Sequence, residues 1–226
     1  MHAVMLVFPR MTQLDLTAPY EVLARFEELS LHLVWKNLDP VTDSGGLRLL
    51  PTCTFADCPK ASILFVPGGP GQISLMEDAE VLAFLRRQAA EASYVTSVCT
   101  GSLILAAAGL LTGYRATCHW LSLEQLAYFG AVPVKERVVI DCNRITGAGV
   151  TSGIDFALTL AAHLFGDDRA KRAQLAIEYD PKPPFAGGTP ATASPDLVEG
   201  LRAKNASFQA ERDKVARRAA AALRPG

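Results

Sequence analysis

Short runs rich in valine, isoleucine and leucine alternate along this chain with segments of helical pattern, and this alternation constrains its fold more than any other feature. Strands of a parallel sheet are buried on both faces, so they are apolar throughout and are joined by helices. The sequence therefore predicts an α/β fold with a mostly parallel central sheet and helices on both faces. The predicted strands are 3–8, 31–36, 62–67, 94–99, 115–118 and 137–146, and 47–55 is a candidate edge strand.

Helix signals lie between the predicted strands. Thr17 and Pro19 indicate a helix whose first turn contains the proline. Acidic residues at 77–78 ahead of Arg86 and Arg87 indicate another helix, because the helix dipole favours that order of charges. The remaining predicted helices are 101–111, which is nearly all apolar, 151–165 and 167–178, and the proline-rich segment 180–195 is predicted to be an irregular loop.

The length of 226 residues fits one domain with a tail. We expect an α/β domain over 1–195 and a C-terminal helical extension over 196–226 that packs on the domain or at a dimer interface. The helix predicted over 196–224 carries seven basic and four acidic residues, a net charge of +3. Aromatic side chains do not interleave with the basic ones as single-strand nucleic-acid binding requires, so a solvated or dimer-packing helix is expected.

Charge and cysteine content narrow the class of protein further. The formal net charge of −1 gives no basic field to recruit nucleic acid or a membrane surface, so neither partner is expected. The N-terminus lacks the basic region of a signal peptide, and the longest apolar runs reach about half the ~20 residues of a membrane span. Five cysteines without a C-x-x-C pair indicate reduced thiols and no zinc site, so a cytoplasmic protein is predicted.

The string SVCTGS, residues 97–102, joins a strand pattern to a small-residue helix pattern. A nucleophile at such a turn adopts a strained backbone, and only small side chains fit two residues before and after it, here Ser97 and Gly101. Cys99 also faces a helix N-terminus, whose free amides are expected to lower its thiol pKa. We therefore predict that Cys99 is a nucleophile. The cysteines predicted to be buried and inert are Cys53, Cys58, Cys118 and Cys142.

Two residues are candidates for the proton partner of Cys99. His119 is one, because many cysteine hydrolases use histidine. Asp15 is the other, since it lies between leucines after the first strand, and a buried carboxylate is expensive unless it is used.

The glycines of the loop PGGPG, residues 67–71, permit close approach of its backbone. Loops after parallel strands gather at one edge of the sheet, so this loop is expected to meet Asp15 and Cys99. Pro70 has no N–H and cannot donate to an anion. The predicted donors are the N–H groups of Gly69 or Gly71 and of Thr100.

The string GAGVTSG, residues 147–153, is a near match to the dinucleotide-binding fingerprint. It comes late in the chain, no further strand and helix clearly follow it, and no acidic partner for a ribose stands on a later strand. Nucleotide binding is therefore not predicted.

With these motifs the chain resembles the ThiJ/PfpI superfamily, which is similar to class I glutamine amidotransferases, and within it the isocyanide hydratase branch. The resemblance covers residues 3–190, and its strings include QLDLTAPYEVLA, PGGPG, YVTSVCTGSLILAAAGLL, RATCHW and GIDFALTLAA. It implies a flavodoxin-like three-layer sandwich and a homodimer whose active sites lie near the interface.

The resemblance also implies a nucleophile at Cys99, followed by Thr100 as in this branch, and a proton carrier at Asp15, where the superfamily most often has glutamate. The branch adds water to a small-molecule isocyanide and releases an N-substituted formamide. In the implied scheme the Cys99 thiolate attacks and Asp15 supplies a proton, giving a thioimidate that water then hydrates with Asp15 as base. This scheme requires no metal or organic cofactor.

Two departures from the superfamily pattern concern the pocket. Cys118 stands where threonine is usual, and Ala148 interrupts a glycine run whose backbone approaches the nucleophile in this branch. The extra methyl group at 148 is expected to restrict the motion of the helix over 151–165 or to alter a substrate pocket beside Val150. Alternative functions at the same cysteine are a glyoxalase-like, deglycase-like or amidase activity, and a different class is a ligand- or redox-sensing module.

Overall fold

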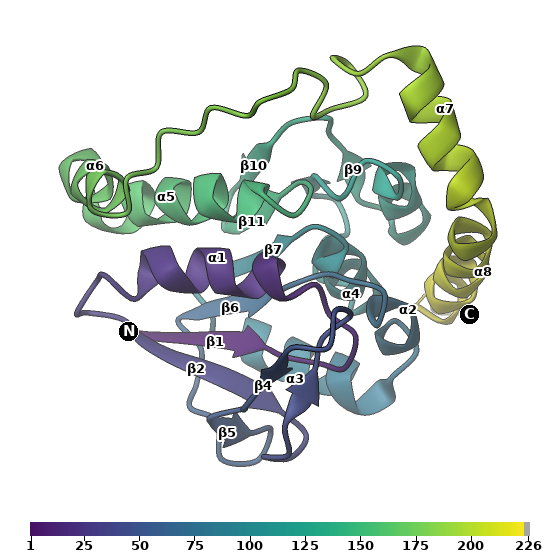
Figure 1. Cartoon of the computed structure of the whole chain (residues 1–226). Helices are drawn as coiled ribbons and strands as arrows, with labels where there is room; N and C mark the ends of the chain where they lie inside the picture. The colour runs from purple at the N-terminus through teal and green to yellow at the C-terminus, as the bar shows by residue number, and fades with distance from the viewer. Residues whose placement is uncertain (224–226) are drawn as a thin grey trace.

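A seven-stranded sheet forms the centre of the computed structural model, which describes residues 1–223 (Figure 1). Its spatial order is β10-β11-β7-β6-β1-β2-β5, and every neighbouring pair is parallel except β10 with β11. The predicted α/β fold with a mostly parallel sheet is thereby confirmed. The strands are β1 (His2–Leu6), β2 (Ser30–Trp35), β5 (Cys53–Thr54), β6 (Ile63–Val66), β7 (Tyr94–Val98), β10 (Val138–Asp141) and β11 (Arg144–Gly147).

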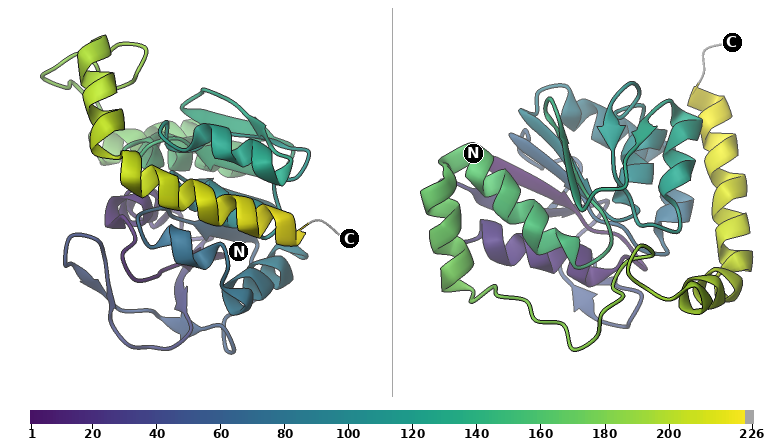
Figure 2. Two further views of the ribbon diagram at one scale, coloured as in Figure 1. Left: turned by 90° about the vertical axis from the view of Figure 1, so that its right-hand side faces the viewer. Right: turned by 90° about the horizontal axis from the view of Figure 1, so that it is seen from above.

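Helices cover the sheet in two groups, which Figure 2 separates when the molecule is seen from above. The first group packs together on one face: α1 (Gln13–Leu23), α5 (Ser152–Phe165) and α6 (Asp167–Ala176). The second group covers the other face: α2 (Gln72–Leu75), α3 (Ala79–Ala89), α4 (Gly101–Ala107), the 3₁₀ helix η1 (Leu123–Phe129) and α8 (Ala206–Leu223). The layers bury a continuous apolar core against β1, β6 and β7.

Three predicted strands differ from the structure. Segment 115–118 contributes only β8 (Arg115–Ala116), which pairs with β9 (Val132–Pro133) outside the central sheet. Segment 137–146 is a hairpin rather than one strand, because a two-residue turn between β10 and β11 reverses the chain. Within 47–55 the edge strand is β5 alone, since β4 (Arg48–Leu49) pairs with β3 (Val41–Thr42) in a separate sheet.

Helix α1 begins five residues before the predicted position, so Pro19 lies inside it rather than in its first turn. Proline lacks an N–H, so the ring leaves one carbonyl of the helix without its usual partner. Close packing against α5 compensates for this lost hydrogen bond. A Cβ on Gly153 of α5 would lie 3.0 Å from Cδ of Pro19, so the two helices meet closely at a glycine. The early start places Asp15 in the first turn of α1 instead of in the loop before it.

The other predicted helices agree with the structure apart from their ends. Asp78 caps α3 by accepting hydrogen bonds from the N–H groups of Glu80 and Val81, and α4 ends before Gly109, which has a φ of 79°. Residues 180–194 contain no helix or strand, as predicted. No helix within residues 1–223 is long and apolar enough to cross a membrane.

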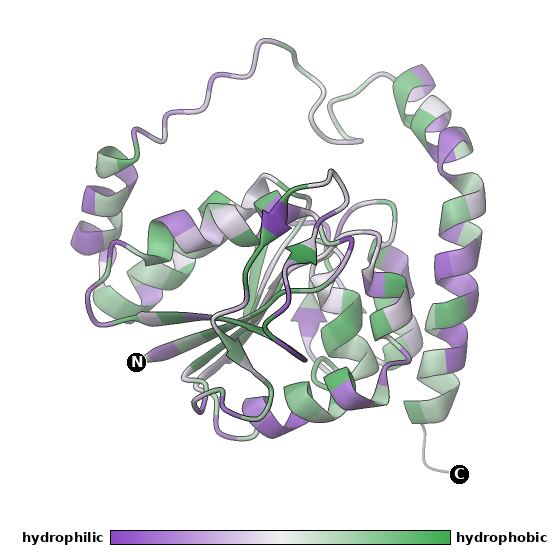
Figure 3. Cartoon of the chain, turned by 60° about the horizontal axis from the view of Figure 1, so that its bottom comes forward, coloured by the Kyte–Doolittle hydropathy of each residue, from purple (hydrophilic) through white to green (hydrophobic). Residues whose placement is uncertain are grey.

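The C-terminal segment forms two helices, α7 (Pro195–Lys204) and α8, where one had been predicted over 196–224. They meet at Asn205, and residue 224 lies outside the described residues. Helix α7 buries none of its residues, whereas α8 packs against η1, α4 and α2. Figure 3 shows both helices as alternating polar and apolar bands. The division into 1–195 and 196–226 stays a prediction.

Candidate active site

Cys99 lies at the sharp turn between β7 and α4, with a φ of 59° and only 5% of its surface exposed. A residue with a side chain pays roughly 1–2 kcal/mol for this left-handed conformation, so the predicted strain is confirmed. Two carbonyls at the end of β11, those of Gly147 and Ala148, accept hydrogen bonds from its N–H at 3.0 and 2.8 Å. A Cβ at Gly101 would clash with the Val66 carbonyl oxygen, so a small residue is required there, as predicted.

Asp15 is completely buried in the first turn of α1. Its Oδ2 accepts a hydrogen bond of 2.9 Å from the Gly68 N–H, while its Oδ1 is buried without a partner among the described residues. A buried carboxylate oxygen without a donor disfavours the charged form, so the environment of Asp15 suits a group that carries a proton.

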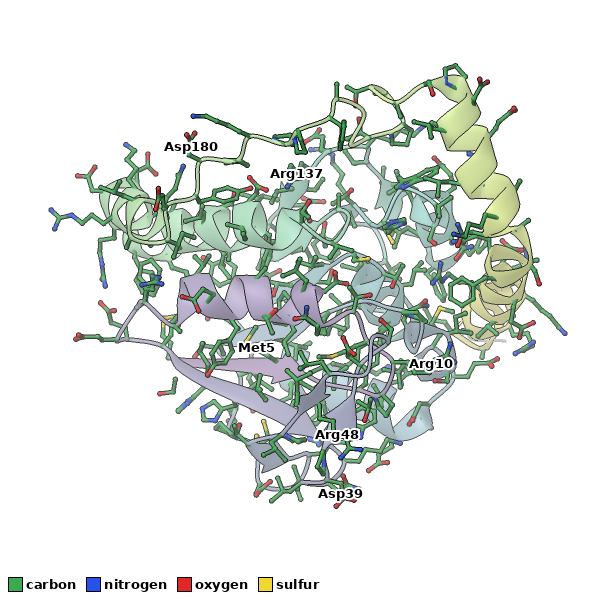
Figure 4. The ribbon with its side chains drawn as sticks, in the orientation of Figure 1. Met5, Arg10, Asp39, Arg48, Arg137 and Asp180 are labelled. Atoms are coloured by element: carbon green, nitrogen blue, oxygen red, sulfur yellow. The ribbon has the colours of Figure 1, made fainter. Side chains whose placement is uncertain are left out.

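The PGGPG loop connects the two groups. The Thr12 N–H donates to the Gly68 carbonyl at 2.9 Å, and the Gly69 N–H donates to Oγ1 of Thr100 at 3.0 Å. A Cβ on Gly68 would lie 2.5 Å from N of Thr100 and 3.0 Å from Oδ2 of Asp15, so only glycine fits. The predicted convergence of the three loops is therefore confirmed. In Figure 4, the labelled Arg10 marks the loop that leads from β1 to α1.

The predicted anion donors of this loop are already used inside the protein. The Gly69 N–H is donated to Thr100, and the Gly71 N–H is donated to the Arg10 carbonyl at 3.0 Å. Their substrate-binding role stays a prediction that these contacts do not favour. The Thr100 N–H, which lowers the pKa of the Cys99 thiol, is the remaining predicted donor. Val150 is half-buried after β11, and its predicted place in the pocket is likewise untested.

Electrostatics differ from the sequence prediction at Cys99. Burial, followed by the charge of Asp15, raises the pKa of the Cys99 thiol well above its usual range. The Thr100 N–H lowers that pKa, as a helix N-terminus should, but it does not outweigh the other effects. The predicted low pKa of Cys99 is therefore wrong.

The pKa of Asp15 is raised as well. Burial raises its pKa to about 7, opposed by the hydrogen bond from the Gly68 N–H and by the nearby Cys99 thiol. The two side chains therefore titrate as one coupled unit, and near neutral pH the pair loses its first proton. Moving the remaining proton from sulfur to carboxylate gives a thiolate beside a neutral acid, which is the reactive combination.

The surroundings of His119, the other candidate proton partner, keep its ring neutral. Its Nδ1 accepts a hydrogen bond of 3.3 Å from the Leu121 N–H, and its ring lies beside Gly149. Burial, followed by the charge of Arg212, lowers the pKa of His119 to about 4, so the imidazole is neutral at pH 7. Cys118 is buried and its pKa is raised to about 12, as an inert cysteine requires. Cys142, by contrast, is exposed, so its predicted burial is wrong.

A hydrogen-bonded chain beneath the turn was not found from the sequence. The hydroxyls of Ser97 and Ser102 lie 2.8 Å apart, and Ser102 donates to the Thr117 carbonyl at 2.7 Å. The Thr117 N–H donates to Oγ1 of Thr146 at 2.9 Å. This chain ties β7 and α4 to the strands beside them and fixes the turn. Small polar residues on both sides of Cys99 were the signal for it.

The glycine-rich string 147–153 serves packing. A Cβ on Gly147 would lie 2.9 Å from Oγ of Ser152, and Gly153 lets α5 approach α1. Ala148 is half-buried, and its N–H donates to the Arg137 carbonyl at 2.9 Å. Over residues 1–223, no three His, Cys, Asp or Glu side chains are arranged to hold a metal ion.

Several known proteins are similar to this chain in sequence or in fold. Isonitrile hydratase of Pseudomonas putida is 55% identical over 218 residues, which cover 96% of each chain. The crystal structure of a THiJ/PfpI family protein from Pseudomonas syringae matches with a TM-score of 0.93 at 47% identity, covering 95% of this chain and 90% of that one. The HTH-type transcriptional regulator GbdR of Pseudomonas aeruginosa is 32% identical, covering 76% of this chain and 48% of the regulator. The sequence profile of the DJ-1/PfpI family matches residues 1–163, and the chain belongs to that family.

Proposed function

We propose that this protein is an isocyanide hydratase, which adds water to an isocyanide to give an N-substituted formamide. One observation carries the proposal: the buried pair of Cys99 and Asp15 lies in a chain that is 55% identical to an isonitrile hydratase along nearly its whole length. Because the burial of both groups holds a proton between them near neutral pH, the pair can deliver a nucleophile and an acid together.

In the proposed mechanism the Cys99 thiolate bonds to the terminal carbon of the isocyanide while the Asp15 carboxyl protonates the same carbon. The product is a thioimidate on Cys99, and Asp15 is left ionised. Asp15 then activates a water molecule, whose oxygen bonds to that carbon while one proton goes to the nitrogen. As the C–S bond breaks, the second proton returns to Asp15, the thiolate is released and the formamide departs.

Thr100 supports the sulfur in this mechanism. Its N–H faces the Cys99 thiol and favours the anion that forms when the C–S bond breaks. Its hydroxyl accepts from Gly69 and so holds the loop that contacts Asp15 through Gly68. Val150 and the two loop glycines are proposed to shape the pocket around the substrate.

Formamide production from a simple alkyl isocyanide tests the proposal, with the wild type, Cys99→Ala, Asp15→Asn and the exposed-cysteine control Cys142→Ala. We expect turnover by the wild type and the control, none above background by Cys99→Ala, and a large loss in Asp15→Asn. Turnover by Cys99→Ala excludes the covalent mechanism, and a wild type without turnover on aryl and alkyl isocyanides excludes the proposed activity.

A sensing function is less well supported. The similarity to GbdR covers about half of that regulator. Redox sensing by Cys99 requires an accessible thiolate, whereas Cys99 is buried and its pKa is raised. Together these properties favour catalysis on a small substrate that enters the site.

We further propose that the protein is a homodimer. Exposed apolar side chains on α1 and near the segment after α6 support this: Leu14, Tyr20, Leu175 and Phe185. A depression of about 310 Å³ lies between α1, α5 and residues 177–179, close to the turn that holds Asp15. Light scattering during gel filtration should give twice the chain mass, and a monomer at micromolar concentration contradicts the proposal. The cytoplasmic location stays a prediction.

A further inference from the structure

Arg212 belongs to the C-terminal segment that was expected to present its basic residues to solvent, yet only 4% of its surface is exposed. Its Nε donates to Oε1 of Gln72 and its Nη1 donates to Oγ of Ser122, both at 2.9 Å. The guanidinium also lies 4.5 Å from the ring centre of Phe208, one turn earlier in α8. Figure 2 shows α8 lying across the helices that cover this face of the sheet.

No ion pair found within residues 1–223 includes Arg212. Three carboxylates near it have other partners: Glu77 pairs with Arg218, Asp213 with Arg217 and Tyr128, and Glu124 with Lys135. Glu211, the preceding residue of α8, is exposed and forms no ion pair among residues 1–223. A buried charge without a counter-ion costs several kcal/mol. We therefore expect the charge of Arg212 to interact with other groups, such as polar side chains or an anion that forms during the reaction.

The hydrogen bonds of Arg212 reach both sides of the active site. Gln72 is the first residue of α2 and follows the PGGPG loop directly, while Ser122 follows the segment that contains Cys118 and His119. Nε2 of Gln72 is buried and has no partner among the described residues. Arg212 therefore joins α8 to two segments that border Cys99.

We propose that Arg212 is a positioning residue of the active site, which holds Gln72 and Ser122 in place and sets an unpaired positive charge beside Cys118 and Cys99. The charge favours the anionic state of the Cys99–Asp15 pair and of the sulfur that is released from the product. The inference concerns the reactivity of Cys99 itself, so it can be tested whether or not the substrate is an isocyanide.

The titratable groups that face Arg212 define the sign of the effect. They are Cys118, Cys99 and His119, whose pKa values or that of Arg212 respond to the mutual charge, and Asp15 acts on Cys99 in turn. Burial lowers the pKa of Arg212, and the two thiols raise it, as expected for a cation near groups that become anions. His119 is neutral above its pKa of about 4, so it does not offset the charge at pH 7. Removing the positive charge must therefore raise the pKa at which Cys99 becomes reactive.

The test is the pH dependence of Cys99 alkylation by iodoacetamide, followed by mass spectrometry of the Cys99 peptide in the full-length protein. The variants are Arg212→Met, Arg212→Gln and Arg212→Lys, with Arg218→Met as a control that removes an exposed charge from the same helix. In the two neutral variants we expect the apparent pKa to rise by about one unit and the rate at pH 7 to fall about tenfold. Arg212→Lys keeps the charge and should stay within about threefold of the wild type.

Circular dichroism and gel filtration identify the variants that fold. Arg212→Gln accompanies Arg212→Met because its amide can replace some of the lost hydrogen bonds if the apolar side chain is not tolerated. An apparent pKa that is unchanged in a folded neutral variant overturns the inference, even if that variant loses turnover. An equal shift in Arg218→Met also overturns it, because the effect would then come from the overall charge of α8. Absence of isocyanide turnover in the wild type would count against the proposed function and leave this alkylation result intact.

Discussion

Two cysteines in this protein have nearly the same unusual backbone and opposite surroundings. Cys99, with a φ of 59°, ends β7 and is buried, whereas Cys142, with a φ of 53°, lies in the turn between β10 and β11 and is exposed. Cys99 is in contact with Asp15 and the Thr100 N–H. The sulfur of Cys142 donates to Oδ1 of its neighbour Asp141 at 3.6 Å, and it has no other hydrogen bond among residues 1–223.

The comparison separates strain from function. A positive φ marks a place where the chain reverses sharply, and both a hairpin and a strand-to-helix turn need one. Only the turn at Cys99 also brings a buried carboxyl and a helix N-terminus to the sulfur. The reactivity of a strained cysteine is therefore set by the groups that the fold places around it.

The largest expected effect separates the two cysteines directly. Cys99→Ala should lower isocyanide turnover by more than about 10⁴-fold because the covalent step is lost, while Cys142→Ala should keep wild-type turnover. Steady-state formamide production measures both. Comparable losses in the two variants would show that the environment of Cys99 has no special role.

Asp15→Asn removes the buried carboxyl next to Cys99, a group that Cys142 does not have. Turnover should fall by about 10²–10⁴-fold because no group remains to carry the proton. Cys99 should nevertheless alkylate faster at pH 7, since the charge of Asp15 raises the thiol pKa. Parallel turnover and alkylation assays check this, and slower alkylation in the folded variant would contradict the assigned interaction.

The same substitution should change stability. Because folding raises the pKa of Asp15 from 3.8 to about 7, the folded wild type loses stability as pH rises through that interval. At pH 8 Asp15→Asn should therefore be more stable by up to about 4 kcal/mol, and the gain should shrink toward pH 4. Urea unfolding at several pH values measures it, and a gain that does not depend on pH would contradict the shift.

Cys142→Gly should have the smallest effect. Glycine adopts a positive φ without strain, so the free energy of unfolding should rise by about 1 kcal/mol with turnover unchanged. Thermal unfolding of this variant beside Cys142→Ala, which keeps the strain, isolates the backbone contribution. Lower stability in the glycine variant would mean that the turn does not store strain.

Local patterns predicted much of this molecule. Apolar strands, the small residues around Cys99 and the position of Asp15 after the first strand were sufficient to locate the fold and the pair. The start of α1 was missed because packing against Gly153 tolerates Pro19 inside the helix. The hairpin within 137–146 was missed because Cys142 is not a usual turn residue.

Long-range burial could not be predicted from local patterns. The thiol pKa of Cys99 was expected to fall because its helix N-terminus is visible in the sequence, whereas the burial that raises it is produced by the whole fold. In the sequence, Arg212 cannot be distinguished from the exposed basic residues around it, because its burial also depends on the whole fold. Its burial depends on how α8 meets α2 and η1, which are about 140 and 90 residues away in the sequence.

The central claim is that Cys99 and Asp15 share a proton near neutral pH, and the pH dependence of kcat/KM for isocyanide hydration tests it most directly. The active form of the pair has lost one proton, so kcat/KM should fall about tenfold per pH unit below about 7 and level off above it. A kcat/KM that stays constant from pH 5 to pH 8 in the folded wild type would contradict the claim.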